Sequence, residues 1–265
     1  MEQRVTPYLL YEDGAAAIGF LTKAFGFREE MRTTGSAGGM HAELEVGPAG
    51  GWIHLGQPLE RYRNPAVVGK TSLVYVIVDD LDGHHARAKD AGARIIEEPA
   101  DRDYGYRRYS CVDPQGHEWY FAQPLAEEAP LADIVPFIGY EDPGAAADWL
   151  VRAFGFEEVE RLEEDGEVGH VTLRSGDGLV YLGHPDGYLN PLHLREQCEA
   201  ATRMYDVPWI VDGVWLAVDD IDALAERARA AGARILTEPE HTSHGRQCRI
   251  EDPEGHRWML GERPR

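Results

Sequence analysis

Hydrophobic and polar residues alternate along several short stretches of the chain, the pattern of β-strands that bury one face. The alternation is clearest over residues 39–46 and 51–56, and residues 72–78 form a more continuous apolar strand. Shorter segments of the same kind predict further strands near residues 5–11, 94–97, 107–112 and 117–122.

Two helices are predicted between these strands. Asp13 is a good N-cap for a helix that Gly26 would end, and Asp79 and Asp80 precede a helix that runs to Gly92. Strands and helices together give a β-α-β-β-β pattern that occurs twice in the first half of the chain.

The second half of the chain repeats the first. The sequence Tyr-Glu-Asp occurs at residues 11–13 and 140–142, and Asp-Pro-x-Gly-His-x-Trp occurs at 113–119 and 252–258. Repetition of this length indicates two homologous units and four modules in all.

The repeat predicts the domain boundaries. We expect a first domain over residues 1–123, a linker over 124–133 and a second domain over 134–265. The spacing between the copies widens in the second domain, which locates a 14-residue insertion near residues 192–205. Its apolar spacing predicts a helix, which could act as a lid over the second domain's site.

Composition narrows the possible partners. The chain has 265 residues, 43% of them hydrophobic, and 26 Lys and Arg against 47 Asp and Glu give a net charge of −21. This charge argues against nucleic acid and anionic membranes as partners. Three cysteines without a Cys-x-x-Cys pair exclude a disulfide framework. Without an apolar run of membrane-spanning length or a signal peptide, we expect a cytoplasmic protein.

The module order and three motifs resemble the vicinal oxygen chelate superfamily, which includes glyoxalase I, bleomycin-resistance proteins and extradiol dioxygenases. The motifs are Val-Asp-Asp-Leu-Asp at 78–82, Ala-Gly-Ala-Arg-Ile at 91–95 and the Asp-Pro-x-Gly-His-x-Trp repeat. The resemblance implies an α+β fold of four βαβββ modules, in which two modules pair their sheets into a curved, mixed sheet with a cup for ligands. It also implies that the two units of one chain pair like the subunits of a homodimer. Whether two such chains also form a homodimer is left open.

The same resemblance locates the superfamily's metal ligands. In the first unit these positions are Thr6, His54, Leu73 and Tyr120, and in the second they are Val135, Tyr181, Gly213 and Met259. One histidine among eight positions is too few donors for a divalent metal. We therefore expect no metal and no cofactor at the family positions.

Strand alternation then predicts which side chains face the cups, because residues i and i+2 share a face. In the first unit these are Tyr8, Trp52, His54, Tyr75 and Tyr120, and in the second they are Phe137, Leu179, Tyr181 and Trp215. An aromatic concavity suits a flat, apolar or π-rich small molecule. The alternative is that these rings fill the cups themselves.

Three polar residues are further candidates. His41 and His170 match in the repeat and lie on the polar faces of their strands, either as ligand-facing groups or as exposed strand residues. Arg107 is either a counter-charge for an anionic ligand or a partner for surface carboxylates. His84 lies on the apolar face of its helix, which favours a structural role.

The first hypothesis is a metal-independent protein that binds and sequesters a small hydrophobic or aromatic compound. The alternative is a metal-dependent lyase, isomerase or dioxygenase that uses His54 and His41. A scaffold without a ligand is the third hypothesis.

Overall fold

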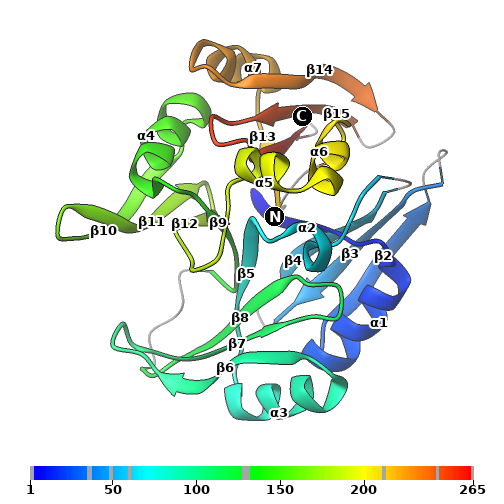
Figure 1. Ribbon diagram of the computed structural model, residues 1–265, viewed down its shortest axis with the longest axis vertical. Coiled ribbons are helices and arrows are strands. Elements are labelled where there is room, and N and C mark those ends of the chain that lie inside the picture. Colours follow the sequence, from blue (N-terminus) through cyan, green and yellow to red (C-terminus); the bar gives the residue numbers. More distant parts are fainter. Residues whose placement is uncertain are drawn as a thin grey trace.

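The computed structural model describes residues 3–34, 38–47, 50–58, 61–126, 132–210, 213–242 and 245–263. Four modules follow one another along the chain (Figure 1). Module 1 consists of β1 (Val5–Leu10), α1 (Gly14–Phe25), β2 (Arg28–Thr34), β3 (Met40–Val46) and β4 (Gly51–Gln57). Module 2 consists of β5 (Ser72–Ile77), α3 (Leu81–Ala91), β6 (Arg94–Asp101), β7 (Tyr106–Val112) and β8 (Glu118–Pro124).

The second half repeats this order. Module 3 consists of β9 (Ile134–Gly139), α4 (Pro143–Phe154), β10 (Glu157–Glu164), β11 (Glu167–Ser175) and β12 (Gly178–Gly183). Module 4 consists of β13 (Gly213–Val218), α7 (Ile221–Ala230), β14 (Arg234–Thr242), β15 (Gly245–Glu251) and β16 (Arg257–Glu262). Between modules lie the short helix α2 (Pro65–Val68) and, in the predicted insertion, α5 (Pro191–Gln197) and α6 (Glu199–Tyr205). Of the predicted linker, residues 127–131 lie outside the described residues.

The four module helices begin and end as their sequences predict. The carboxylates of Asp13 and Asp80 accept hydrogen bonds from backbone N–H groups of the first turn, and Asp142 and Asp220 do the same. Gly26 ends α1 at φ 77°, a left-handed conformation that glycine adopts without strain.

The strands form two eight-stranded mixed sheets, each of which takes one module from each half of the chain. Sheet A has the order β14-β15-β16-β13-β1-β4-β3-β2, and sheet B has the order β10-β11-β12-β9-β5-β8-β7-β6. The joins are the antiparallel pairs β1–β13 and β5–β9. Grouping the cup residues by sequence unit was therefore wrong, because first strands of modules in different halves pair directly.

The hydrophobic cores, in contrast, follow the halves of the chain. One core packs modules 1 and 2 together around α1 and α3, and a second packs modules 3 and 4 around α4 and α7. Eight strand residues that face the helices, on the side of the sheets opposite the cups, are at most 1% exposed: Ile53, Leu55, Val74, Val76, Trp119, Phe121, Trp258 and Leu260. Each half thus shares a core, while each sheet joins the halves.

The repeated Asp-Pro-x-Gly-His-x-Trp motif ties the modules of one half together. Asp113 accepts hydrogen bonds from the Tyr11 hydroxyl at 2.8 Å and from the Trp119 indole at 3.2 Å. Asp252 accepts the equivalent bonds from Tyr140 and Trp258. The motif is therefore structural.

The insertion packs against both halves of the chain, and none of its residues is among those that line the cavity described below. Apolar side chains of α5 and α6 pack in a third core with residues of both halves: Leu10, Tyr62, Val68, Leu194, Ala201, Met204, Tyr205, Ile210 and Met259.

Among the described residues, no helix is long and apolar enough to cross a lipid bilayer.

Candidate ligand-binding site

The concave face of sheet A, which we call cup A, contains a cavity of about 620 Å³. Side chains from six strands and the N-terminal segment line it: Gln3, Thr6, Tyr8, His41, Glu43, Trp52, His54, Trp215, Gln247, Arg249 and Met259. Its walls come from modules 1 and 4, so the cavity exists only because β1 pairs with β13.

A hydrogen-bonded group occupies the module 1 side of cup A. His41 Nε2 lies 3.3 Å from the Glu43 carboxylate, and His41 Nδ1 lies 3.3 Å from the Tyr8 hydroxyl. A carboxylate only accepts hydrogen bonds, so the His41 Nε2–H group donates to Glu43. In this neutral tautomer Nδ1 carries no proton and accepts a hydrogen bond from the Tyr8 hydroxyl. His54 Nε2 lies 4.0 Å from the same carboxylate.

Burial keeps two members of this group uncharged. Desolvation lowers the pKa of His54 to about 3, and the neighbouring His41 lowers it further in the same direction. Desolvation also raises the pKa of Tyr8 to about 12. At neutral pH, cup A thus presents a neutral imidazole and a neutral phenol.

Two tryptophans form the aromatic surface of the cup. Trp215 lies across Gly261 of the neighbouring strand, so closely that a Cβ on Gly261 would lie 2.0 Å from the indole ring. The Trp215 ring centroid is 6.0 Å from that of His54. Trp52 lies on β4, two residues before His54 and on the same face.

The side chains do not fit the metal that the superfamily's enzymes use. At the family positions on sheet A, only His54 has a metal-ligating side chain, beside Thr6, Gly213 and Met259. His41 and Glu43 lie close by but are hydrogen-bonded to each other. Within the described residues, no three His, Cys, Asp or Glu side chains are arranged to hold a metal ion.

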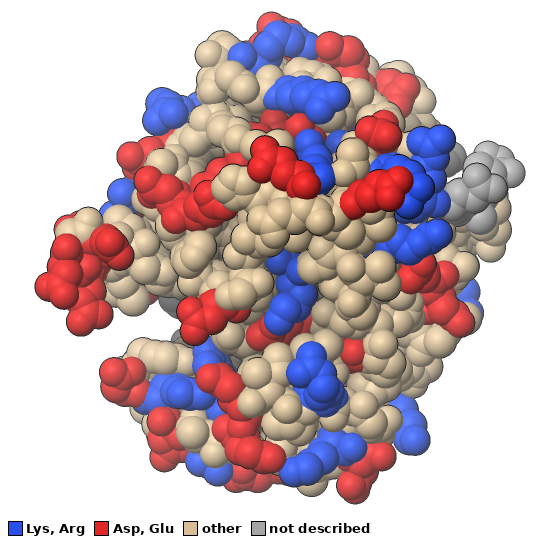
Figure 2. Space-filling model, in the orientation of Figure 1, with Lys and Arg blue, Asp and Glu red and all other residues tan. Residues whose placement is uncertain are grey.

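Sheet B forms a second concave face, cup B, with different chemistry. The Tyr75 and Tyr181 rings meet edge to face at 5.7 Å, and His170 contacts Tyr181 at 5.2 Å. The Arg108 guanidinium stacks 4.2 Å from the Tyr120 ring centroid and pairs with Glu97. Figure 2 shows acidic and basic side chains interspersed and a recess between the projecting β10–β11 hairpin and module 2.

The predicted cup residues divide between the two faces. Cup A brings together Tyr8, His41, Trp52, His54 and Trp215, whereas Tyr75, Tyr120, Phe137, His170 and Tyr181 belong to strands of sheet B. All ten side chains are partly exposed, while Leu179, on the same face of β12 as Tyr181, is only 2% exposed.

Arg107 forms ion pairs with carboxylates outside the cups. Its guanidinium pairs with Asp82 of α3 at 3.0 Å and with Asp101 at 2.9 Å, on the helix side of sheet B. The interpretation as a partner of surface carboxylates is therefore the one that the contacts support. Arg108 and Arg249 face the cups instead, and the sequence analysis missed both. The alternation along residues 107–112 and their repeat carries the signal that places them.

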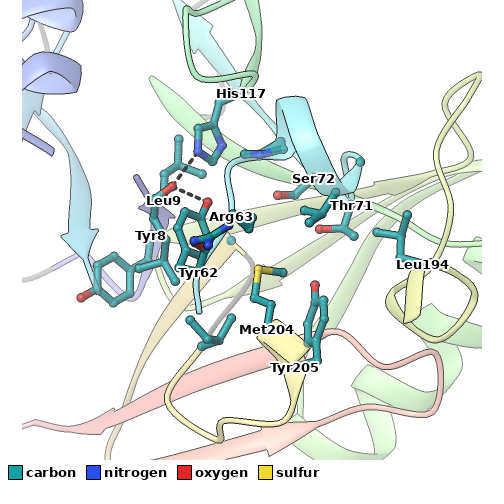
Figure 3. Close-up of a pocket in the computed structure, with 16 residues that line it drawn as sticks. Tyr8, Leu9, Tyr62, Arg63, Thr71, Ser72, His117, Leu194, Met204 and Tyr205 are labelled. Carbon is teal, nitrogen blue, oxygen red and sulfur yellow. Dashed lines mark hydrogen bonds between the residues drawn. The ribbon is translucent and has the colours of Figure 1, made fainter. Parts of the chain in front are cut away.

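A smaller cavity of about 40 Å³ lies where α2, α6 and β1 meet (Figure 3). Two of its lining side chains, Tyr62 and His117, donate hydrogen bonds to the carbonyl oxygen of Leu10 at 2.5 and 2.8 Å. Its volume suits about one water molecule. It is a packing space between modules, whereas cup A has room for an organic ligand.

Known proteins share this sequence pattern and fold. The sequence profile of the Glyoxalase/Bleomycin resistance protein/Dioxygenase superfamily matches residues 4–121 and again 134–260. An uncharacterised protein from Mycobacterium bovis is 31% identical over 134 residues, 48% of this chain and 87% of the relative. Glyoxalase I from Zea mays superposes with a TM-score of 0.73 at 15% identity, covering 98% of this chain and 92% of that one. A putative dioxygenase from Bacillus subtilis gives 0.63 at 15% identity, covering 98% and 84%. The chain therefore belongs to the Glyoxalase/Bleomycin resistance protein/Dioxygenase superfamily and carries two family units in tandem.

Proposed function

We propose that this protein binds and sequesters a small aromatic molecule in cup A, without a metal ion at the superfamily's ligand positions. The observation that carries the proposal is the cavity of about 620 Å³ between Trp52, Trp215 and Tyr8. A volume in this range matches pockets that enclose drug-sized ligands.

The chemistry of the walls supports an aromatic ligand. Indole and phenol rings bury large apolar areas and favour stacked or edge-to-face contacts with another ring. The neutral forms of His54 and Tyr8 add hydrogen-bonding groups without a net charge. The runner-up, a metal-dependent lyase, isomerase or dioxygenase centred on His54 and His41, lacks a matching donor set and is not our proposal.

Binding is tested with a panel of uncharged two- and three-ring aromatic compounds. We expect some of them to quench tryptophan fluorescence and to stabilise the fold, by about 2.7 kcal/mol at roughly 100 times their Kd. Trp52→Leu removes one stacking surface and should weaken binding about tenfold.

The matched control is Trp209→Leu. Trp209 is 40% exposed and is not among the residues that line cup A, so its loss should leave the affinity unchanged. A panel without a single stabilising compound would contradict the proposal. So would equal weakening by the two substitutions.

A further inference from the structure

The module 4 side of cup A contains an arginine without a carboxylate partner. Among the described residues, no carboxylate lies within ion-pair distance of Arg249, and its Nη1 donates one long hydrogen bond of 3.5 Å to the Thr237 hydroxyl. Its Nε is buried and has no hydrogen-bond acceptor. Burying a guanidinium without such partners costs free energy, so this charge calls for a functional explanation.

Two neutral side chains beside it are also unpaired. Gln247 is 3% exposed and Thr6 is 2% exposed, and both line the cavity. Neither side chain makes a hydrogen bond with any residue that the structure describes. Because both side chains line the cavity, their amide and hydroxyl groups can donate hydrogen bonds to a polar ligand atom. We call Thr6, Gln247 and Arg249 the donor group.

Three other arginines on the strands of modules 2 and 4 have carboxylate partners within the chain. Arg108 of cup B pairs with Glu97, Arg107 pairs with Asp82, and Arg246 pairs with Asp222 at 2.8 Å. In a chain with 47 acidic and 26 basic residues, carboxylates are abundant. Arg249 differs from these three arginines, because it lines a cavity and has no carboxylate partner among the described residues.

The sheet register places the donor group next to the aromatic surface. Thr6 pairs with Trp215 across β1 and β13, Trp215 pairs with Met259, and Met259 pairs with Arg249. These four residues form one row across sheet A, with Thr6 at one end and Arg249 at the other. Gln247 lies two residues before Arg249 on the same face of β15.

Building on the proposed function, we infer that the ligand of cup A is an aromatic carboxylate, held by Arg249 at its anionic group and by Trp215 along its ring. A guanidinium binds a carboxylate through two parallel N–H···O bonds, and Gln247 and Thr6 supply further donors. The donor group thus adds an anionic group to the aromatic ligand of the proposed function.

The test compares two probes of nearly equal shape, 2-naphthoate and the uncharged 2-naphthamide, by titration calorimetry at neutral pH and low salt. We expect wild-type protein to bind the carboxylate at least about tenfold more tightly than the amide, as for a charge-assisted hydrogen bond. Arg249→Gln should abolish this preference while leaving the affinity for the amide unchanged. Retained amide binding also verifies that the variant is folded.

Two further variants sharpen the comparison. Arg249→Lys keeps the charge and should retain part of the preference. Arg246→Gln removes a charge from the same strand on the opposite face, where Asp222 holds it, and should retain the preference in full.

The outcomes separate this inference from the proposed function. Equal binding of the two probes by the wild-type protein, or a preference that survives Arg249→Gln, overturns the aromatic carboxylate and leaves an aromatic site. Failure of both probes and of the uncharged panel overturns both.

Discussion

His54 makes the stability of the fold depend on pH in a predictable direction. Burial and then His41 lower its pKa from 6.5 to about 3, with 17% of the side chain exposed. Below pH 6.5 the unfolded chain takes up a proton here that the folded chain does not bind. The free energy of unfolding should therefore fall with falling pH between these two values, by about 1.4 kcal/mol per pH unit from this group alone.

His54→Gln should make this fall shallower, measured by urea unfolding in the upper part of that pH interval. Burial lowers the pKa of His84 and His117 as well, so the variant keeps a residual slope. Exposed His241, replaced by glutamine, is the control and should follow the wild-type curve. Identical slopes for His54→Gln and wild type would show that His54 titrates normally in the fold.

Single residues in the cups were predictable only as far as strand alternation reaches. The period of two placed Tyr8, Trp52 and His54 on one face, where the cavity has them. It carried no information on partners, so Arg107 was named as a possible counter-charge and Arg249 was missed. What distinguishes them is the presence of Asp82 and Asp101 beside the first, a tertiary contact that no local pattern encodes.

Arg257 anchors the C-terminal end of α6 and the segment that follows it through their backbone carbonyl groups. Its side chain is 1% exposed, pairs with Glu251 at 2.9 Å and donates to the backbone oxygens of Tyr205, Val207 and Ile210. Arg257→Met leaves these buried carbonyl oxygens without their donor, while Glu251 keeps Arg195 and Arg234 as ion-pair partners. We expect a loss of about 1–3 kcal/mol in the free energy of unfolding, measured with urea.

Arg203→Met is the matched control for this element. Arg203 lies on the same insertion, 65% exposed, in an i,i+4 pair with Glu199, and such surface pairs contribute little. Its substitution should leave the unfolding midpoint within error. A comparable loss in both variants would mean that Arg257 does not anchor the insertion.

Elements were predictable where capping residues or alternation marked them. The helices between Asp13 and Gly26 and between Asp80 and Gly92 are present as expected. Strand β2 gave no signal of its own, because six of its seven side chains are exposed and no apolar face alternates. The insertion was correctly expected to be helical. Its packing partners lie in other modules, and the apolar pattern of the insertion alone does not predict which residues they are.

At the scale of the whole molecule, the repeat and the family motifs predicted the modules but not how they pair. The first strands of the modules are all short and apolar, with sequences VTPYLL, SLVYVI, IVPFIG and GVWLAV. Any of them has an edge suited to antiparallel pairing with another. Only the assembled structure shows that β1 pairs with β13 and β5 with β9.

This pairing predicts that the two halves stay together without a covalent connection. Two antiparallel strand pairs and the third core join them, with Tyr62 and Val68 on one side and Leu194 and Met204 on the other. A protease site introduced between residues 126 and 132, within the predicted linker, and then cleaved should leave a single particle near 29.6 kDa by size exclusion with light scattering.

The cleaved protein should also keep its response to aromatic compounds, because modules 1 and 4, which build cup A, lie on different fragments. As a control, Met204→Asp places a charge in the third core, and the cleaved variant should separate or unfold at lower urea concentrations than the cleaved wild type. Separation of the cleaved wild-type protein into two half-sized species that still bind the compounds would contradict the shared sheets. Each fragment would then have to hold a complete cup.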